Sequence, residues 1–467
     1  MYYSLHNHTD FSNASCGFMD SINKTEDLIN YAFNIGLNGL AITDHESVSA
    51  HVRAIQHYKK MLENASEEEK EKVKNFRLML GNEIYLARPD LTKENHKKGE
   101  RFYHFLLVAK DKIGQKQLRE LSSKAWSRAY YKSVQRRFNI NSDFENIIVP
   151  NRGHVIATTA CLGGPTAAFY QNNDEKTAVQ LISQFLERMK YVFGSDNFFI
   201  EMAPSKFKDQ IEYNKFMYRY FGDKYNFVIT TDSHYLNQED FNTFKTVLNS
   251  GSGEREVEEF YKYSHMMTWK EVLSYFDYFN QEFLESCRLN TIKIGETSEF
   301  YDLEEPSRIP RIPIPETIGK INYDVSEYSN IQKFINSEYK QDRQYIKKIF
   351  DNFEELISED KRKDALERID LELSEVWGIS EALNQRMSDY LLTVAKVIEV
   401  MWDQADAIVG PGRGSAVAFI TNYLLGITQL NPLEYPVAIP HWRFISSERP
   451  DLPMLQYWVS IKDGEPC

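Results

Sequence analysis

The sequence contains 467 residues, of which 68 are Asp or Glu and 55 are Lys or Arg, so its net charge at pH 7 is −13. At roughly 150 residues per domain, this length predicts about three domains, or one large domain and a smaller one. The composition, 42% hydrophobic and 26% charged, excludes collagen-like and wholly disordered chains. No apolar run is long enough to cross a bilayer. The excess of acidic residues argues against non-specific coating of nucleic acid, but it does not exclude a local basic groove.

The cysteines and the first residues predict the compartment. Cys16, Cys161, Cys287 and Cys467 include no CxxC pair, so we expect neither a disulfide framework nor a thiolate zinc finger. The opening residues, MYYSLHNHTD, match neither a signal peptide nor a basic transit peptide. We therefore expect a protein of the reducing cytoplasm with no membrane partner.

The first 250 residues alternate short β-rich runs with helical stretches, a pattern typical of βα units around a parallel sheet. One helix is clear, because residues 26–35 combine an acidic first turn with an apolar stripe and end before Gly36. The charged run at 67–74 predicts a solvated helix face. Seven strands favour a closed barrel over an open sheet, and they are expected at residues 2–5, 39–43, 78–86, 105–109, 155–158, 198–202 and 227–231.

The remaining residues follow a different pattern. The alternation stops at residues 250–253, Ser-Gly-Ser-Gly, and the chain then has a mostly helical pattern as far as about residue 405. The exception is PSRIPRIPIP at 306–315, whose prolines predict an extended connector. We therefore expect boundaries near residues 250 and 385, which give domains 1–250, 251–384 and 385–467.

Side chains that bind metals follow several of the predicted strands. Residues two apart in an extended segment point to the same side, as in His6-Asn7-His8 and in Asp232-Ser233-His234. In a (β/α) barrel the carboxyl ends of the strands converge on one face, where functional residues gather. The histidines, carboxylates and thiol at these positions are His6, His8, Asp44, His45, Glu83, Cys161, Glu201, Asp232 and His234.

Two interpretations of these side chains compete. Imidazole and carboxylate ligands suit zinc, manganese or iron, and a set larger than one ion needs implies two or three divalent ions that activate water and hold a phosphate ester. In the structural alternative, a single histidine is a satisfied core residue, and Ser12, Asp20 or an Asp-His pair caps a helix. Four of the eleven histidines fall at predicted strand ends, which favours the metal site, while Glu201 fits either interpretation.

The segments LHNHTDFS, AITDHE and TTDSHY resemble the signatures of the polymerase-and-histidinol-phosphatase (PHP) domain, which opens bacterial and phage DNA polymerase III alpha subunits. The resemblance implies a distorted (β/α)7 barrel with a trinuclear metal cluster. Asp20 is assigned through GFMDSIN, across a short insertion, and His104 precedes its strand, so spacing alone would not select it. The implied ligands are His6, His8, Asp20, His45, Glu83, His104, Cys161, Asp232 and His234, with His8, Asp232 and His234 as catalytic residues.

A glycine-rich turn precedes an apolar helix at 409–427, VGPGRGSAVAFITNYLLGI. Glycines allow close approach of a ligand, Ser415 is a natural N-cap, and the free N–H groups of the helix favour an anion. Arg413 can hold a phosphate with two hydrogen bonds. The alternative is an ordinary capped helix, and the sequence lacks the GK[ST] of a Walker loop. PGRGSA, with YLLGIT, NPLEY and RFISSERPDLP, resembles the start of the polymerase palm of the same subunits, which implies that Gly412, Arg413, Gly414 and Ser415 contact a nucleotide triphosphate.

The palm resemblance breaks after Pro453. There the family places two aspartates, one residue apart, that hold Mg²⁺ for nucleotidyl transfer, whereas this sequence has Met454 and Gln456. A thioether and a neutral amide do not replace carboxylate ligands of a hard cation. Asp451 and Asp463 lie nearby but not at the required positions. We therefore do not expect this chain alone to extend a primer.

We expect an α/β fold in which the barrel precedes a mostly helical thumb and a partial palm. Three functions are consistent with this fold and these residues. The first is metal-dependent hydrolysis of phosphodiesters, as a 3′–5′ exonuclease on DNA. The second is the N-terminal part of a split polymerase that needs a C-terminal polypeptide. The third is a non-catalytic regulator or partner of other replication proteins, whose metal cluster only stabilises the fold. Metal analysis with a nuclease assay separates the first from the third, and primer extension with an added partner tests the second.

Overall fold

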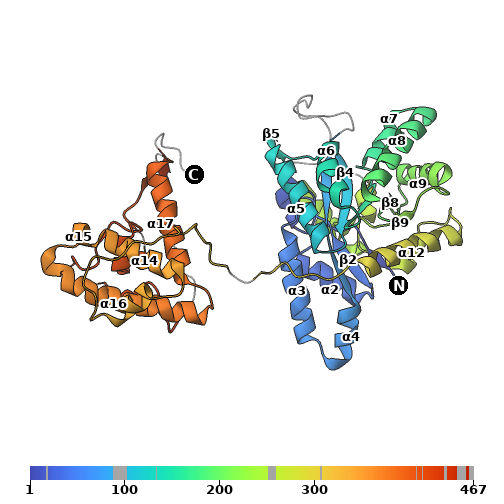
Figure 1. Cartoon of the computed structure of the whole chain (residues 1–467). Coiled ribbons are helices and arrows are strands. Elements are labelled where there is room, and N and C mark those ends of the chain that lie inside the picture. The colour runs from blue at the N-terminus through green and yellow to red at the C-terminus, as the bar shows by residue number, and fades with distance from the viewer. Residues whose placement is uncertain are drawn as a thin grey trace. The chain divides into compact units, whose positions relative to one another are not determined.

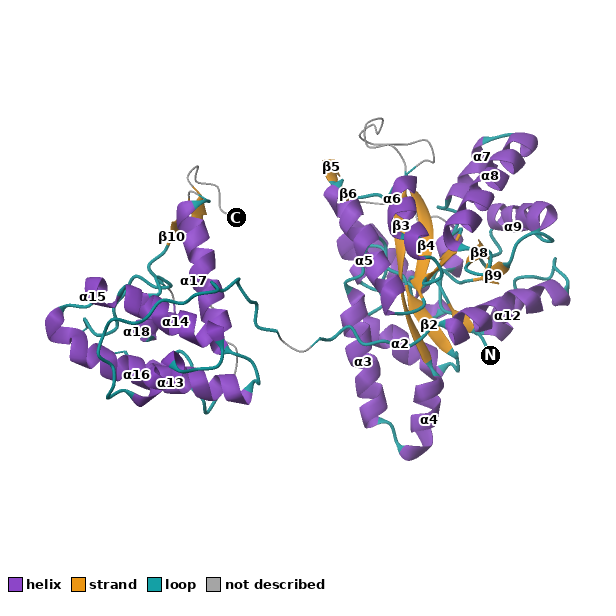
Figure 2. Cartoon of the chain, viewed as in Figure 1, coloured by secondary structure: helices purple, strands orange, loops and turns teal. Residues whose placement is uncertain are grey.

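A computed structural model describes residues 1–16, 19–87, 102–132, 134–250, 259–305, 308–405, 407–412, 414–435, 439–449 and 459–461 (Figure 1). The chain divides into two compact units, Met1–Glu305 and Pro306–Cys467. The first unit combines strands and helices, whereas the second is mostly helical (Figure 2). None of the described helices has the length and apolar composition that a membrane-spanning helix requires.

The centre of the first unit is a seven-stranded sheet with the order β1-β2-β3-β4-β7-β8-β9. Past the ends of β1 and β9, Asn7 and Ser233 form a parallel bridge, in which the His8 N–H donates to Ser233 O at 2.9 Å. This link brings the first and last strands together, so the α/β class with a barrel-like first unit is confirmed. The strands coincide with the seven predicted runs: β1 (Tyr3–Ser4), β2 (Gly39–Ile42), β3 (Arg77–Leu86), β4 (Tyr103–Ala109), β7 (Val155–Thr158), β8 (Phe198–Met202) and β9 (Phe227–Ile229).

The expectation of a wholly parallel sheet is wrong for one strand. Strand β4 pairs antiparallel with both β3 and β7, whereas the other neighbours in the sheet are parallel. The amino end of β4 therefore lies at the rim where the other strands have their carboxyl ends, and Tyr85 of β3 is paired with His104 of β4. This reversal explains how a residue at the start of a strand can join the others at that rim.

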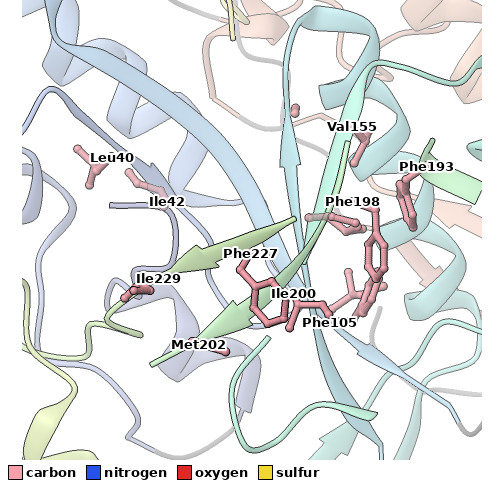
Figure 3. Close-up of a cluster of buried hydrophobic side chains, with 14 of the residues drawn as sticks. Leu40, Ile42, Phe105, Val155, Phe193, Phe198, Ile200, Met202, Phe227 and Ile229 are labelled. Carbon is pink, nitrogen blue, oxygen red and sulfur yellow. The ribbon is translucent and has the colours of Figure 1, made fainter. Parts of the chain in front are cut away.

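Side chains alternate along the strands between two apolar cores, as the period of two requires. One core lies between the sheet and the helices and includes Leu40, Phe105 and Ile200 (Figure 3). The other takes one side chain from each strand and lines the inside of the curled sheet. Its members are Tyr3, Leu5, Ala41, Met79, Val108, Ile156, Phe199, Val228 and Ile294.

Helices surround this sheet, and two of them lie where the sequence analysis located a helix. The helix expected at 26–35 is α2, which precedes Gly36 in a left-handed conformation (φ +81°), and the charged run at 67–74 lies in α4, of which only Val73 is buried. The hairpin β5 (Tyr130–Lys132) and β6 (Val134–Arg136) adds a second, small sheet. The helices are α1 (Phe11–Cys16), α2 (Thr25–Asn34), α3 (Ala50–Asn64), α4 (Glu67–Asn75), α5 (Lys112–Ser127), α6 (Asn141–Ile147), α7 (Pro165–Asn172), α8 (Glu175–Phe193), α9 (Lys208–Phe221), α10 (Phe241–Ser250), α11 (Trp269–Leu273) and α12 (Gln281–Thr297).

The second unit has one apolar core, which includes residues from Ile309 to Ile445. Described residues 308–315 of the proline-rich segment form neither helix nor strand, as expected. The elements are α13 (Ser329–Ile335), α14 (Lys340–Asp351), α15 (Phe353–Leu356), α16 (Arg362–Ala382), α17 (Met387–Asp403) and α18 (Ile420–Leu424), with β10 (Ala407–Val409) paired to β11 (Val459–Ile461).

The observed division differs from the boundaries expected near 250 and 385. Helix α12 packs in the first unit, because Leu284 and Cys287 belong to its large core and Ile294 to the core inside the sheet. Residue 385 lies between α16 and α17, which contribute to the same core of the second unit. The compact units instead divide once, at the start of the proline-rich segment.

Candidate metal centre

The nine predicted ligands all lie among the described residues, and eight of them are buried. They come from the segments after β1, β2, β7 and β9, from within β3 and β4, and from the segment before α2. His104 is the partly exposed member, with 28% of its side chain accessible. The buried members are His6, His8, Asp20, His45, Glu83, Cys161, Asp232 and His234.

Asp232 lies at the centre of one ligand group. Its Oδ1 is 3.2 Å from His6 Nε2 and 3.1 Å from His8 Nε2. The three donor atoms of this group lie within 4.8 Å of one another, close enough to share one ion. The same Oδ1 is 3.3 Å from Nε2 of His234.

Glu83 connects two further groups. Its Oε1 is 3.3 Å from Nδ1 of His104. The same Nδ1 lies 3.6 Å from Sγ of Cys161. Its Oε2 is 2.7 Å from His45 Nδ1 and 3.4 Å from His8 Nε2. In the group Glu83-His104-Cys161, and also in the group His8-His45-Glu83, the three donor atoms lie within 4.8 Å of one another, close enough to share one ion. The two oxygens of one carboxylate thus face two different groups.

Asp20 joins the cluster from the segment that precedes α2. Its Oδ2 lies 3.2 Å from His45 Nε2 and 3.2 Å from His234 Nδ1. The contact with His234 connects it to Asp232, and the contact with His45 connects it to Glu83. The structure therefore brings all nine predicted ligands into one continuous cluster.

The donor set fits cations. Both oxygens of Glu83 and Nε2 of His6 are buried, and they face one another and other donors of the cluster without hydrogen bonds of regular geometry. Burying a carboxylate is costly unless a nearby positive charge or a donor compensates it, and a cation among these atoms would do so. Nitrogen, oxygen and thiol donors together are the set expected for zinc, manganese or iron.

A carboxylate below the cluster orients His6. Glu201 Oε1 accepts a hydrogen bond from His6 Nδ1 at 2.6 Å, which turns Nε2 of the ring toward the ligand group. The hydroxyls of Thr158 and Thr230 donate to the two Glu201 oxygens. Glu201 is thus a positioning residue in this structure, a role that the sequence analysis did not assign to it.

A second chain of hydrogen bonds orients His8. Its Nδ1 donates to Ser12 Oγ at 3.0 Å, and that hydroxyl donates to Asp44 Oδ1 at 2.8 Å. The Thr9 N–H also donates to Asp44, at 2.6 Å. Partners of this kind fix the tautomer of a ligating imidazole. In the sequence, Asp44 stands out only as the neighbour of His45. The spacing of the residues gave no indication that its carboxylate is linked to His8.

Burial and charge determine the protonation of the cluster in the absence of ions. Burial and neighbouring imidazoles lower the pKa of His8 to about 3, so its Nε2 offers a lone pair. Burial alone would lower the pKa of His6, but three nearby carboxylates raise it well above its ordinary value. Burial, with carboxylates adding to it, raises the pKa of the Cys161 thiol. A bound cation opposes the protonated states of His6 and Cys161, so metal binding should release protons.

The backbone at this rim is strained. Among the described residues, four other than glycine have a positive φ, and three of them follow strands at the rim: Glu46 (45°), Ala160 (57°) and Asp232 (46°). Such conformations cost of order 1–3 kcal/mol each and persist where the surroundings enforce them, commonly at functional sites. Each lies next to or at a proposed ligand: Glu46 follows His45, Ala160 precedes Cys161, and Asp232 is itself one of the nine.

A cavity of about 520 Å³ opens beside the cluster. Asp20, His45, His104 and Cys161 form part of its wall, so the ligands are accessible from it. Its other described lining residues are Tyr85, Leu162, Gly163, Gln171, Phe207, Asp209, Glu259, Phe260 and Tyr261.

The glycine-rich turn of the second unit differs in part from the expectation. Gly412 (φ +126°) and Gly414 (φ +68°) have the backbone conformation that favours glycine. Ser415 is exposed and lies inside a 3₁₀ helix, Gly414–Ala418, so it does not cap an α-helix. Arg413, Met454 and Gln456 fall outside the described residues.

The helix that follows this turn is α18, and its first N–H groups are already occupied. The N–H groups of Ile420 and Thr421 donate to the two oxygens of Glu372 at 2.8 and 2.9 Å. Glu372 is buried, and Arg368 Nε donates to its Oε1 at 2.9 Å. The expectation of free N–H groups at this helix is therefore wrong, because a carboxylate of the chain itself fills that place.

Comparisons with known proteins agree with the two units. The PHP domain family matches residues 4–205, and the family described as bacterial DNA polymerase III alpha NTPase domain matches residues 343–455. Probable DNA polymerase YorL of Bacillus subtilis and the DNA-directed DNA polymerase of Bacillus phage SPbeta are each 39% identical over 96% of this chain and 36% of their own length. DNA polymerase III subunit alpha of Aquifex aeolicus is 26% identical over 96% of this chain and 35% of its own.

The chain spans little more than a third of the length of these curated relatives. Among solved structures, an amidohydrolase from Chromobacterium violaceum aligns with 59% of this chain and 96% of its own, at 13% identity and a TM-score of 0.31, a likeness too low to carry an argument.

Proposed function

We propose, from the matches of this chain to the PHP domain family and to the bacterial DNA polymerase III alpha family, that its PHP-like unit is a metal-dependent 3′–5′ exonuclease acting in DNA replication. The proposed metal ligands are the nine residues of the cluster, His6, His8, Asp20, His45, Glu83, His104, Cys161, Asp232 and His234. They would hold two or three divalent ions. DNA and other replication proteins are the partners that the family implies.

The observation that carries this proposal is the position of Glu83. Each of its oxygens faces a different group of donors, Oε1 at 3.3 Å from His104 Nδ1 and Oε2 at 2.7 Å from His45 Nδ1. A carboxylate in that position suits two neighbouring cations better than one. When bound, such ions supply activation of water and stabilisation of charge on a phosphate ester.

The residues of the chain orient and hold the donors. Glu201 and Ser12 fix the rings of His6 and His8, so that both Nε2 atoms face Asp232. His234 Nδ1 donates to the backbone oxygen of Asp20 at 2.9 Å, which turns its Nε2 toward Asp232. We therefore propose His8, Asp232 and His234 as the catalytic residues, since their donor atoms converge on one point.

A nucleotide site at the glycine-rich turn is a separate proposal. The positive φ of Gly412 and Gly414 supports close approach of a triphosphate to the turn itself, together with Arg413 and Ser415. Because Glu372 occupies the start of α18, the phosphates would contact the turn rather than the helix. Polymerase activity, with Mg²⁺ and a C-terminal polypeptide, rests on this proposal.

The test compares His8→Ala and Asp232→Ala with wild type. We measure bound metal by mass spectrometry and release of nucleotides from a 5′-labelled single-stranded oligonucleotide. Both variants should lose bound metal and at least about 99% of the hydrolysis, while circular dichroism shows a folded protein. His57→Ala is the matched control, because His57 bonds to Asn30 outside the cluster and should keep both properties. Metal-loaded wild type without hydrolysis would support the non-catalytic scaffold instead.

A further inference from the structure

The cavity beside the cluster is bounded on one side by ligands and on the other by residues with no role in the proposed metal site. Its volume, about 520 Å³, lies within the roughly 300–1,000 Å³ of small-ligand sites. Asp20, His45, His104 and Cys161 form the first wall. A phosphate held at the ligands would therefore have one of its two substituents inside this cavity.

Aromatic rings form much of the remaining wall. The ring of Tyr85 lies beside the ligands, with centroids 5.6 Å from His45 and 5.3 Å from His104. Across the lining, Phe260 stacks on Tyr261 at 4.2 Å and 28°. Tyr261 is itself held edge-on against His234 at 5.3 Å. Nucleobases of any sequence stack on such rings, because every base has a π-face.

Two carboxylates line the same cavity without belonging to a ligand group. Asp209 lies in the first turn of α9, and Glu259 begins the 3₁₀ helix Glu259–Tyr263 that carries Phe260. Both side chains are exposed. Their charge opposes entry of any negative group in addition to the phosphate at the ligands.

We infer that this cavity receives the terminal nucleoside of a single-stranded 3′ end, and that Asp209 and Glu259 reject ends that carry a 3′-phosphate. The inference rests on the proposed nuclease function and adds to it the part of the substrate that the cavity selects. The base stacks on the rings around Phe260, and the uncharged sugar with its 3′-hydroxyl lies near the carboxylates.

The reaction balances with water as the only co-reactant. Water adds to the phosphorus between the last two nucleotides, and the bond from phosphorus to O3′ of the preceding nucleotide breaks. One proton of the water ends on that O3′, so the products are a 5′-mononucleotide and a shortened strand with a new 3′-hydroxyl. The new end carries no phosphate, so the carboxylates admit it for the next cycle.

The experiment uses the full chain with bound metal and two single-stranded oligonucleotides that differ only in a 3′-hydroxyl or a 3′-phosphate. Wild type should remove the last nucleotide at least about tenfold faster from the 3′-hydroxyl end. In the double variant Asp209→Asn/Glu259→Gln, this ratio should fall below about threefold, through faster cleavage of the 3′-phosphate end. Glu212→Gln, on the same helix as Asp209 but outside the cavity lining, should keep the wild-type ratio.

The stacking wall has its own readout. Phe260→Ala should raise KM for the 3′-hydroxyl oligonucleotide by roughly five- to a hundredfold, the range of one base–aromatic stack. Tyr191→Ala, an exposed aromatic of α8 outside the cavity lining, should leave KM unchanged. An unchanged KM in the Phe260 variant would exclude the stacking role.

Failure of the inference is distinguishable from failure of the nuclease itself. Hydrolysis of bis(p-nitrophenyl) phosphate by metal-loaded wild type tests the metal centre without a nucleoside. If wild type cleaves that ester but treats both oligonucleotide ends alike, or if the double variant keeps the wild-type ratio, the inference is wrong and the nuclease proposal stands. If wild type cleaves neither the ester nor the oligonucleotides, the nuclease proposal fails.

Discussion

Replacing Glu201 by glutamine tests whether the cluster depends on the residues below it. Glutamine keeps the size of the side chain and can still accept a hydrogen bond from His6 Nδ1, now as a neutral amide. The hydroxyl of Thr230 can still donate to the amide oxygen, while that of Thr158 can rotate to accept from the amide nitrogen. The substitution thus removes charge from beneath His6 without emptying the site.

The expected size of the effect follows from the bond that changes. A buried hydrogen bond to a charged group contributes about 1.5–3 kcal/mol, and a neutral one about 0.5–1.5 kcal/mol. The difference, about 1–1.5 kcal/mol, corresponds to roughly five- to twelvefold in affinity. Losses of about 10–100-fold are typical of such outer partners of metal ligands, so we expect Glu201→Gln to weaken metal binding by about tenfold.

Metal affinity is measured by competition with a chelator of known strength and checked against metal content after dialysis. Glu145→Gln is the matched control, because Glu145 pairs with Arg188 at the surface and should retain wild-type affinity. Glu83→Gln should lose far more than Glu201→Gln, since it removes a proposed ligand. An affinity for Glu201→Gln within twofold of wild type would refute the positioning role.

Three further predictions concern the stability of the first unit. Burial lowers the pKa of His51 to about 4, so between about pH 6.5 and 4 the unfolded chain binds a proton that the folded chain does not. Acidification across that range should therefore lower the free energy of unfolding by about 3 kcal/mol. Urea titrations at several pH values should show this loss in wild type and not in His51→Gln. A methyl group at Gly295 would lie 2.4 Å from the Tyr3 ring. Gly295→Ala should therefore lower the free energy of unfolding by about 1–2 kcal/mol, although alanine favours a helix more than glycine does. An unchanged urea midpoint would contradict this prediction. Chelation should lower the melting temperature of the first unit and leave that of the second unchanged in calorimetry, since a ligand at about 100 times its Kd stabilises by about 2.7 kcal/mol.

The sequence predicted the strands well because their residues are apolar on both sides. Residues such as Leu40 and Ala41 alternate between the two cores, and both cores are apolar, so each strand is a short continuous apolar run. The direction of a strand leaves no such trace. His104 could therefore be assigned only by resemblance, since its place at the rim depends on the reversal of β4.

The glycine-rich turn shows a different limit of sequence reasoning. Its glycines adopt the conformations that the residue type suggests. What the local sequence could not reveal is Glu372, which lies 48 residues before Ile420 and reaches the start of α18 through the packing of α16. A local motif predicts the donors it exposes, but only the tertiary structure decides what occupies them.

The inside of the curled sheet explains why the ligands meet and why Glu201 is not one of them. The apolar residues of the inner core form its lowest layer. A middle layer lies two residues nearer the rim on the same side of the strands. It consists of Glu201 and of Thr158 and Thr230, whose hydroxyls both donate to Glu201.

Two residues nearer the rim, the same side of β3, of β4 and of the segment after β9 carries proposed ligands. Glu83 follows Met79 by four residues, Asp232 follows Val228 by four, and His104 precedes Val108 by four because β4 runs in reverse. Glu201 stops one layer short, directly beneath His6, and its carboxylate therefore orients a ligand instead of becoming one. A carboxylate or histidine four residues from an inward-facing apolar residue is thus the sequence signal for the proposed ligand layer in β3, in β4 and just after β9. Cys161 does not follow this four-residue spacing, because the left-handed backbone conformation at Ala160 shifts the alternation of side chains by one residue.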